Sequence, residues 1–364
     1  MKKAAAMIII LLLGTMLLGT TAALAKETTA VDENDFDNFQ TVITSGILGE
    51  DMVFDVMPEG YNYYPTEHKG TIERLYYTTD AYDDGEMYTK YVTVYLPYGY
   101  DPEDKDTRYN VLYFQHGNAS SPNALWDAGV PKFNSLNMID NMFDPDHQLM
   151  DPMIIISPTY YFDCDETMLH TDPADGPAGD SRYEGIAGNF YREIVEDLIP
   201  QIESRYNVYC EDFSEEGIKA SRDHRAFSGY SRGSCCTWYV MHHDMEYFGY
   251  FMPMSANILP EGKGIGGDSE EDIFTPEDAY GYIKEALDAN PDPDVFVFAT
   301  AGGEKDGAGQ NMIPQMQCFY DHPETFSYGL DPEENNFYFA LSEFRHMDLV
   351  MPYTLYNARN ILFK

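Results

Sequence analysis

The chain has 364 residues, and its 62 acidic side chains outnumber the 22 basic ones, which gives a formal net charge of −40. A protein this acidic repels nucleic acid and anionic membrane surfaces, so we expect neither as a partner. The length is within the range of one large α/β domain with loop insertions. The five cysteines are an odd number without metal-binding spacing, so we expect no disulfide framework.

The first 25 residues have the features of a secretory signal peptide. Lys2 and Lys3 supply the charged region, residues 7–18 the apolar region, and residues 23–25 the A-x-A cleavage pattern. An uncleaved membrane anchor is the alternative, because residues 4–25 could nearly span a bilayer. We expect cleavage, and therefore a secreted, extracellular protein.

Residues 26–59 are acidic and polar and are expected to form an N-terminal arm or linker, whereas residues 60–364 are expected to form one folded domain. Short apolar segments bounded by Gly, Pro or Asp predict strands in this domain. In chain order they are residues 72–79, 91–96, 109–115, 153–158, 224–229, 250–255, 294–300 and 336–344.

Three longer segments predict helices between and after the later strands. Residues 189–206 carry apolar side chains at a spacing of four, with Pro200 expected to kink the helix. Residues 276–289 follow Thr275 as N-cap, and residues 348–362 close the chain. Early strands in succession, followed by alternating strands and helices, predict an α/β fold with a mixed, mostly parallel eight-stranded sheet flanked by helices.

Residues 229–233 read Gly-Tyr-Ser-Arg-Gly, the G-x-S-x-G pattern of the nucleophile elbow in serine hydrolases. The pattern is short enough to occur by chance, so its surroundings matter. An extended segment precedes it and a helical segment over residues 232–243 follows, as the elbow requires. A glycine–serine turn in another α/β protein is the alternative. The sequence therefore predicts Ser231 as an exposed nucleophile.

A serine hydroxyl needs a general base, and the base needs an orienting carboxylate. In the α/β-hydrolase order the acid and then the histidine follow the serine, each after the carboxyl end of a strand. Asp306 follows the seventh predicted strand and is the expected acid; Glu304 is the alternative, and a turn or N-cap role for Asp306 competes with this interpretation. Among the 9 histidines, position and order favour His346, after the last strand, as the base.

The tetrahedral intermediate of acyl transfer needs two backbone N–H donors. One is expected from Arg232, the residue after the nucleophile. The other is expected from the His-Gly turn after the third strand, with Asn118 as the donor and an ordinary glycine turn as the alternative. A calcium site is the alternative interpretation of the acidic segment over residues 163–182, but this segment lacks EF-hand spacing, and we expect no metal.

Several segments together resemble the feruloyl esterase and esterase D-like family of carbohydrate esterases. They are residues 91–100 (YVTVYLPYGY), 110–117 (NVLYFQHG), 190–206 (FYREIVEDLIPQIESRY), 227–238 (FSGYSRGSCCTW) and 251–256 (FMPMSA), with the Asp306 and His346 loops, in order over roughly residues 60–364. The resemblance implies an α/β-hydrolase fold, a Ser-His-Asp mechanism, no cofactor, and secreted action on ester substituents of plant cell-wall polysaccharide. Many members carry a glycine-rich His-Gly-x-Gly-Gly turn, which residues 118–121 (NASS) replace here.

We therefore expect a serine carboxylic-ester hydrolase that removes feruloyl or acetyl groups from plant polysaccharide or oligosaccharide through an acyl-enzyme. Trp126, Tyr160, Tyr161 and Tyr230 are candidate walls for an aromatic acyl group or a sugar, with core packing as the alternative for each. A catalytically inactive hydrolase fold that binds polysaccharide is a competing hypothesis. Acyl transfer or siderophore-ester cleavage on the same scaffold is another, because one fold supports many acyl substrates.

Overall fold

The computed structural model describes residues 57–364 apart from residues 59, 83–84, 119, 127–134, 162–189, 261–273, 291–293, 304–305, 343 and 347–349. All described residues belong to one compact unit, Val31–Lys364. The predicted signal peptide, nearly all of the predicted arm, the acidic segment 163–182 and Glu304 lie outside the described residues. Within the described part, no helix has both the length and the apolar character needed to cross a membrane.

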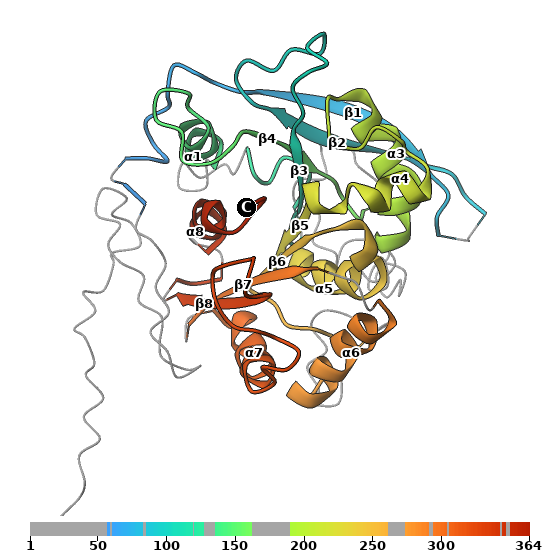
Figure 1. Ribbon diagram of the computed structural model, residues 1–364, viewed down its shortest axis with the longest axis vertical. Coiled ribbons are helices and arrows are strands. Elements are labelled where there is room, and N and C mark those ends of the chain that lie inside the picture. Colours follow the sequence, from blue (N-terminus) through green and yellow to red (C-terminus); the bar gives the residue numbers. More distant parts are fainter. Residues whose placement is uncertain are drawn as a thin grey trace, which may run out of the picture. The chain divides into compact units, whose positions relative to one another are not determined.

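Eight strands form one sheet in the order β1-β2-β4-β3-β5-β6-β7-β8 (Figure 1). Their bounds are β1 Thr71–Thr79, β2 Tyr88–Leu96, β3 Asn110–Gln115, β4 Met153–Ser157, β5 Arg225–Tyr230, β6 Tyr250–Met254, β7 Phe296–Gly302 and β8 Phe337–Ser342. The β1–β2 and β2–β4 pairs are antiparallel, and every pair from β4 to β8 is parallel. The predicted mixed, mostly parallel sheet is confirmed, with each strand close to its predicted position.

The burial of each strand follows from its place in the sheet. All five residues of β4 are buried, and the sequence Met-Ile-Ile-Ile-Ser has no polar side chain before its last position. A strand covered by helices on both faces needs such a continuous apolar run. The outermost strand β1 instead leaves most of its residues exposed or half-buried, as an edge strand can.

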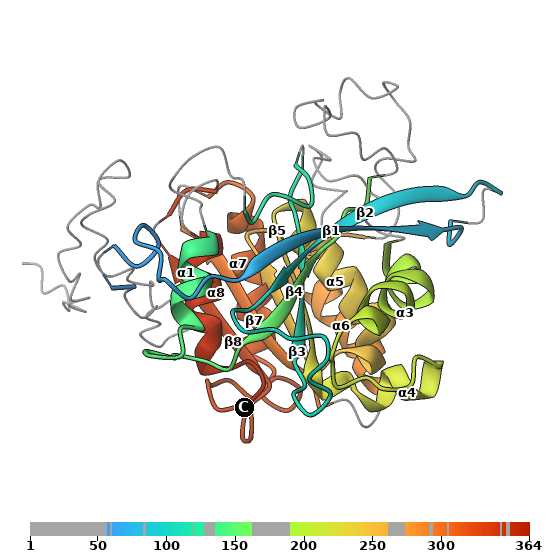
Figure 2. The same cartoon turned by 90° about the horizontal axis from the view of Figure 1, so that it is seen from above.

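Helices cover both faces of the sheet. On one face α5 (Arg232–Asp244), α6 (Pro276–Ala289), α7 (Met312–Tyr320) and the helical run of η5, α3 and η6 pack over the larger apolar cluster. On the other face α1 (Ser135–Met142) and α8 (Val350–Asn357) pack over a second cluster. Figure 2 shows α1 and α8 on one side of the strands and α3, α5 and α6 on the other. Short helical pieces among the described residues include α4 Glu215–Ala220, η7 Arg222–His224, η8 Met245–Tyr247, η10 Gly309–Asn311 and η11 Ala358–Asn360.

The predicted helices form, with two differences. The helix α6 has its predicted bounds, and the Thr275 hydroxyl oxygen accepts a hydrogen bond from the Asp278 amide at 3.1 Å. Around Pro200 the chain changes form, from π-helix η5 (Ile194–Leu198) to α3 (Ile199–Ile202) to a 3₁₀ turn, η6 (Glu203–Arg205). A proline ring clashes with the carbonyl four residues earlier, and a wider turn before it relieves this clash. The last helix α8 is shorter than predicted and ends in the 3₁₀ turn η11.

Two buried ion pairs join this helical segment to the sheet. Lys90 Nζ lies 2.7 Å from a Glu193 carboxylate oxygen, and both side chains are fully buried. Arg225 donates to both carboxylate oxygens of Glu203, at 2.7 and 2.8 Å, and the Tyr113 hydroxyl donates to the same carboxylate at 2.7 Å. Removing one partner of such a pair leaves an unpaired buried charge, which costs about 3–5 kcal/mol.

Candidate active site

The carboxyl ends of β5, β7 and β8 lie at the same edge of the sheet because these strands are parallel. Ser231 follows β5, Asp306 follows β7 and His346 follows β8. His346 Nε2 lies 2.8 Å from Ser231 Oγ, and His346 Nδ1 lies 2.7 Å from Asp306 Oδ1. The Asp306 side chain is fully buried, whereas a quarter of the His346 side chain (25%) is exposed. The structure thus brings the three predicted catalytic residues into one hydrogen-bonded chain.

Ser231 occupies the sharp turn between β5 and α5. Its backbone has φ 57° and ψ −120°, a conformation that residues other than glycine rarely adopt. Such strain costs about 1–3 kcal/mol and persists only where the surroundings enforce it. The Ser231 amide donates to the Met254 carbonyl at 2.8 Å, and the Ser231 carbonyl accepts from the Ser234 amide at 2.8 Å. These bonds fix the backbone on both sides of the serine.

The two glycines of the motif are required by close backbone contacts. A Cβ at Gly229 would lie 2.1 Å from the Gly233 carbonyl oxygen, and a Cβ at Gly233 would lie 2.2 Å from the Gln115 carbonyl oxygen. Neither contact can be relieved by moving a flexible side chain. The first turn of α5 therefore packs directly on the ends of β5 and β3, which positions Ser231.

The carboxylate of Asp306 is held by backbone amides as well as by the histidine. Its Oδ2 accepts from the Gly302 amide at 2.8 Å, and its Oδ1 accepts from the Gly309 amide at 2.9 Å. Burial acts to raise the pKa of Asp306, but the hydrogen bonds from His346 and the Gly309 amide outweigh it and leave the pKa below its ordinary value. Neither of these amide donors is predicted from the sequence, where the glycines around Asp306 are the only hint of them.

The residues predicted to bind the oxyanion lie beside Ser231. Arg232 is the first residue of α5. Gly117 packs against the elbow, since a Cβ there would lie 3.1 Å from Ser231 Cβ. Asn118 follows it, and its side-chain oxygen accepts a hydrogen bond from the Tyr161 hydroxyl at 3.1 Å.

The four aromatic residues predicted to line the site fall into two groups. The ring of Tyr230 lies 5.1 Å from the His346 ring, and both Tyr230 and Tyr161 are partly exposed. Tyr160 is only 1% exposed, and Trp126 is 9% exposed and donates its indole N–H to Thr93. Tyr160 and Trp126 therefore have the core packing that the sequence left as the alternative, and neither ring presents an open face.

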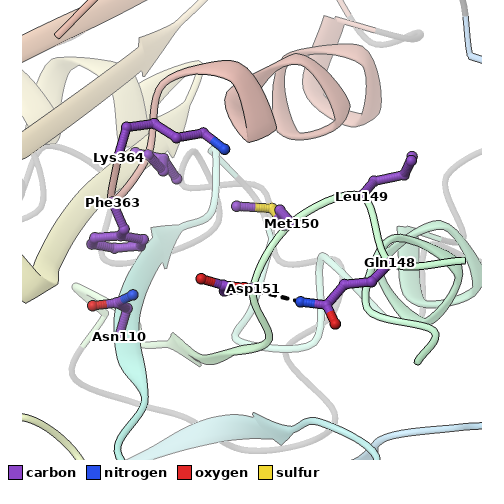
Figure 3. Close-up of a pocket in the computed structure, with 8 residues that line it drawn as sticks. Asn110, Gln148, Leu149, Met150, Asp151, Phe363 and Lys364 are labelled. Atoms are coloured by element: carbon purple, nitrogen blue, oxygen red, sulfur yellow. Dashed lines mark hydrogen bonds between the residues drawn. The ribbon is translucent and has the colours of Figure 1, made fainter.

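Two pockets lie at the end of the sheet opposite to Ser231, His346 and Asp306. One, of about 220 Å³, is lined by Asn110, by residues 148–151 and by residues 362–364 (Figure 3). Asn110 begins β3, so this pocket faces the amino ends of the parallel strands. The other, of about 390 Å³, includes Leu96 and Tyr98 beyond the end of β2, next to Thr71 at the start of β1. Neither contains a residue of the predicted site.

One group of potential metal ligands occurs among the described residues. Single ligand atoms of His68, Asp144 and Asp146 lie within 4.8 Å of one another. The Asp144 carboxylate already has partners: it accepts from the Thr66 hydroxyl and the Asp146 amide and contacts His68 at 3.1 Å. Chiefly the Thr66 hydrogen bond lowers the pKa of Asp144 to about 2. The cluster joins two segments that are distant in the sequence, residues 66–68 and 144–146, and it shares no residue with the predicted active site.

Replacing Gly233 with alanine tests the packing of the elbow. The added Cβ must push α5 away from the Gln115 carbonyl, so we expect Gly233→Ala to lower the free energy of unfolding and to lower any activity at Ser231. Gly281→Ala is the matched control, because no atom lies within 4 Å of a Cβ at this exposed position of α6. The control should gain about 0.5–1 kcal/mol of stability from helix propensity. Urea unfolding measures both; equal stability of the two variants would contradict the packing argument.

Comparison with known proteins identifies the family. Residues 87–321 match the family model described as "Putative esterase". Endo-1,4-beta-xylanase Y of Acetivibrio thermocellus is 34% identical over 260 residues, which are 70% of this chain and 20% of that protein. An endo-1,4-beta-xylanase/feruloyl esterase of Xylanibacter ruminicola is 26% identical over 211 residues, 55% of this chain and 24% of that protein. The chain therefore spans about a quarter or less of the length of these curated relatives.

A solved structure gives the same result at the level of the fold. It is a serine-to-alanine mutant of the feruloyl esterase module from Clostridium thermocellum, complexed with sinapinate. The two chains are 27% identical, with a TM-score of 0.67 over 90% of this chain and 96% of that one. This chain belongs to the esterase family and is a serine esterase with the α/β-hydrolase fold.

Proposed function

We propose that this esterase is secreted and removes feruloyl or acetyl groups from plant cell-wall polysaccharide, with Ser231, His346 and Asp306 as its catalytic triad. The observation that carries the proposal is the chain of hydrogen bonds at 2.8 and 2.7 Å that joins these three side chains. Ser231 Oγ donates to His346 Nε2, and His346 Nδ1–H donates to Asp306. This is the arrangement that activates a serine hydroxyl.

The first half of the reaction acylates the enzyme. Ser231 Oγ attacks the ester carbonyl carbon while its proton passes to His346 Nε2. The amides of Arg232 and Asn118 hold the negative oxygen of the tetrahedral intermediate, and the ionised Asp306 stabilises the imidazolium. The intermediate collapses as the bond to the sugar oxygen breaks; this oxygen takes the proton from His346, and the acyl group stays on Ser231.

The second half of the reaction releases the acid. His346 takes a proton from a water molecule, and the oxygen of that water attacks the acyl carbon. Collapse of the second intermediate breaks the bond to Ser231 Oγ, which regains its proton from His346. The lowered pKa of Asp306 favours its ionised form throughout, so the proton on Nδ1 stays with His346 and does not pass to the carboxylate.

The relatives support the substrate class. Two matched proteins are named as xylanases, one of them also as a feruloyl esterase, and the matched module was solved with sinapinate, an aromatic acid. In this chain Tyr161 and Tyr230 are partly exposed beside the proposed oxyanion hole and His346, where they can contact an aromatic acyl group.

Asp306→Asn tests the assignment of the acid. The amide cannot stabilise the imidazolium and favours the wrong tautomer of His346, so we expect kcat for p-nitrophenyl acetate to fall by about 10³- to 10⁴-fold. Glu304→Gln, at the acid that the sequence left as the alternative, should keep nearly full kcat. A large loss in Glu304→Gln with little loss in Asp306→Asn would reverse the assignment.

Ser231→Ala tests the nucleophile and the substrate together. We expect the wild-type chain to release ferulate or acetate from arabinoxylan, and Ser231→Ala to release no more of either acid than a blank without enzyme. Chromatography of the released acids measures both, and circular dichroism checks that the variant is folded. Release that survives in Ser231→Ala would exclude Ser231 as the nucleophile. Turnover of p-nitrophenyl acetate without release of either acid would exclude this substrate class.

A further inference from the structure

The carbonyl of Gly117 accepts hydrogen bonds from two aromatic side chains. The Tyr160 hydroxyl donates to it at 2.9 Å, and His116 Nδ1 lies 2.7 Å from the same oxygen. Both side chains are buried, with relative exposures of 1% and 0%. A carbonyl oxygen can only accept, so His116 Nδ1 must carry the proton. Two buried donors thus fix one peptide group immediately before Asn118.

The tautomer of His116 is set by its other ring nitrogen. Thr159 Oγ1 accepts from the Tyr161 amide at 3.1 Å and lies 2.8 Å from His116 Nε2. Nε2 therefore accepts the Thr159 hydroxyl proton, which leaves Nδ1–H for Gly117. Burial is the main cause that lowers the pKa of His116 to about 4, so the ring is neutral near pH 7 and keeps this pattern.

The direction of the Gly117 carbonyl determines the direction of the next amide. The described chain contains no cis peptide bond, and in a trans peptide the C=O and N–H groups point in opposite directions. Because the carbonyl points at buried His116 and Tyr160, the Asn118 N–H points away from them. Gly117 itself packs on Ser231, and within the described residues no atom accepts a hydrogen bond from the Asn118 amide.

We propose that Tyr160 and His116 are positioning residues, which clamp the Gly117 carbonyl so that the Asn118 amide faces the oxyanion formed on Ser231. The inference rests on the proposed function, since it assigns how the second donor of that site is oriented. Neither side chain touches the substrate; both act through the peptide group between Gly117 and Asn118.

The two hydrogen bonds to the Gly117 carbonyl restrain a peptide group that would otherwise be free to rotate. Asn118 is exposed at the edge of the sheet, where an unrestrained peptide group could rotate and take its N–H out of the site. An oxyanion donor is effective only when it is already oriented as charge develops, so that no reorganisation is needed during the reaction. Residues 118–121 lack the glycine-rich sequence of many family members. In this chain, side chains from the segment after β4 that contains Tyr160 hold the peptide in place.

Tyr160→Phe removes only the hydroxyl and keeps the ring. We expect kcat for p-nitrophenyl acetate to fall about tenfold with KM nearly unchanged, because the hydrogen bond to the oxyanion strengthens only as the transition state forms. Tyr328→Phe is the matched control: the Tyr328 hydroxyl also donates to a backbone carbonyl, that of Phe339 in β8, at 3.2 Å. The control should keep wild-type kcat and KM.

A transition-state analogue separates positioning from general loss of structure. A trifluoromethyl ketone adds to Ser231 and forms a tetrahedral oxyanion, so its affinity should weaken in Tyr160→Phe by the same factor as kcat. At His116, asparagine can place an amide N–H near the position of Nδ1, whereas leucine cannot donate. We therefore expect His116→Asn to retain more kcat than His116→Leu.

The possible outcomes are distinct. The clamp would be overturned if Tyr160→Phe kept wild-type kcat, changed only KM, or bound the ketone with unchanged affinity. In each of these cases an active wild type would leave the esterase assignment intact. Equal losses in Tyr160→Phe and the Tyr328→Phe control would also overturn the clamp. Absence of ester turnover in the wild type would overturn the proposed function and the clamp together.

Discussion

The turn between β5 and α5 constrains the whole candidate site. Ser231 sits at this tight strand-to-helix junction with φ 57°, and its hydroxyl oxygen lies 2.8 Å from His346 Nε2. The junction exists because Gly229 and Gly233 allow the first turn of α5 to contact the ends of β5 and β3. Its geometry therefore depends on the central strands of the sheet, and these strands in turn depend on the apolar layers that cover both faces.

Parallel strands then bring distant parts of the chain to the serine. His346 is 115 residues from Ser231 along the chain, and Asp306 is 40 residues from His346, yet consecutive hydrogen bonds join the three side chains. Each residue lies in the segment that follows the carboxyl end of a parallel strand, so the sheet places all three at one edge. The backbone around each residue adds local restraint: the Met254 carbonyl holds the Ser231 amide, and the Gly302 and Gly309 amides hold Asp306.

The sequence predicts the features that depend on local pattern. Apolar runs locate the eight strands, Thr275 and Pro276 mark the start of α6, and the order of serine, aspartate and histidine selects three residues that the structure joins. Features that depend on packing are not predictable in this way. Tyr160 and Tyr161 are adjacent and identical in type, but one is buried and donates to Gly117 while the other is partly exposed. The helix α1 is also not predicted, because it has only 8 residues and two of its five buried side chains, Ser135 and Asp140, are polar, which breaks the apolar pattern.

If Ser231 carries the acyl group during turnover, the acyl-enzyme can be trapped on this residue. A feruloyl ester is mixed with the full chain, the reaction is quenched in acid within the first turnover, and peptides are analysed by mass spectrometry. We expect one feruloyl group on the peptide that contains Ser231, and none on that peptide in Ser231→Ala. Turnover without any adduct on the Ser231 peptide would contradict acylation of Ser231. So would an adduct on another residue of the wild type that persists in Ser231→Ala.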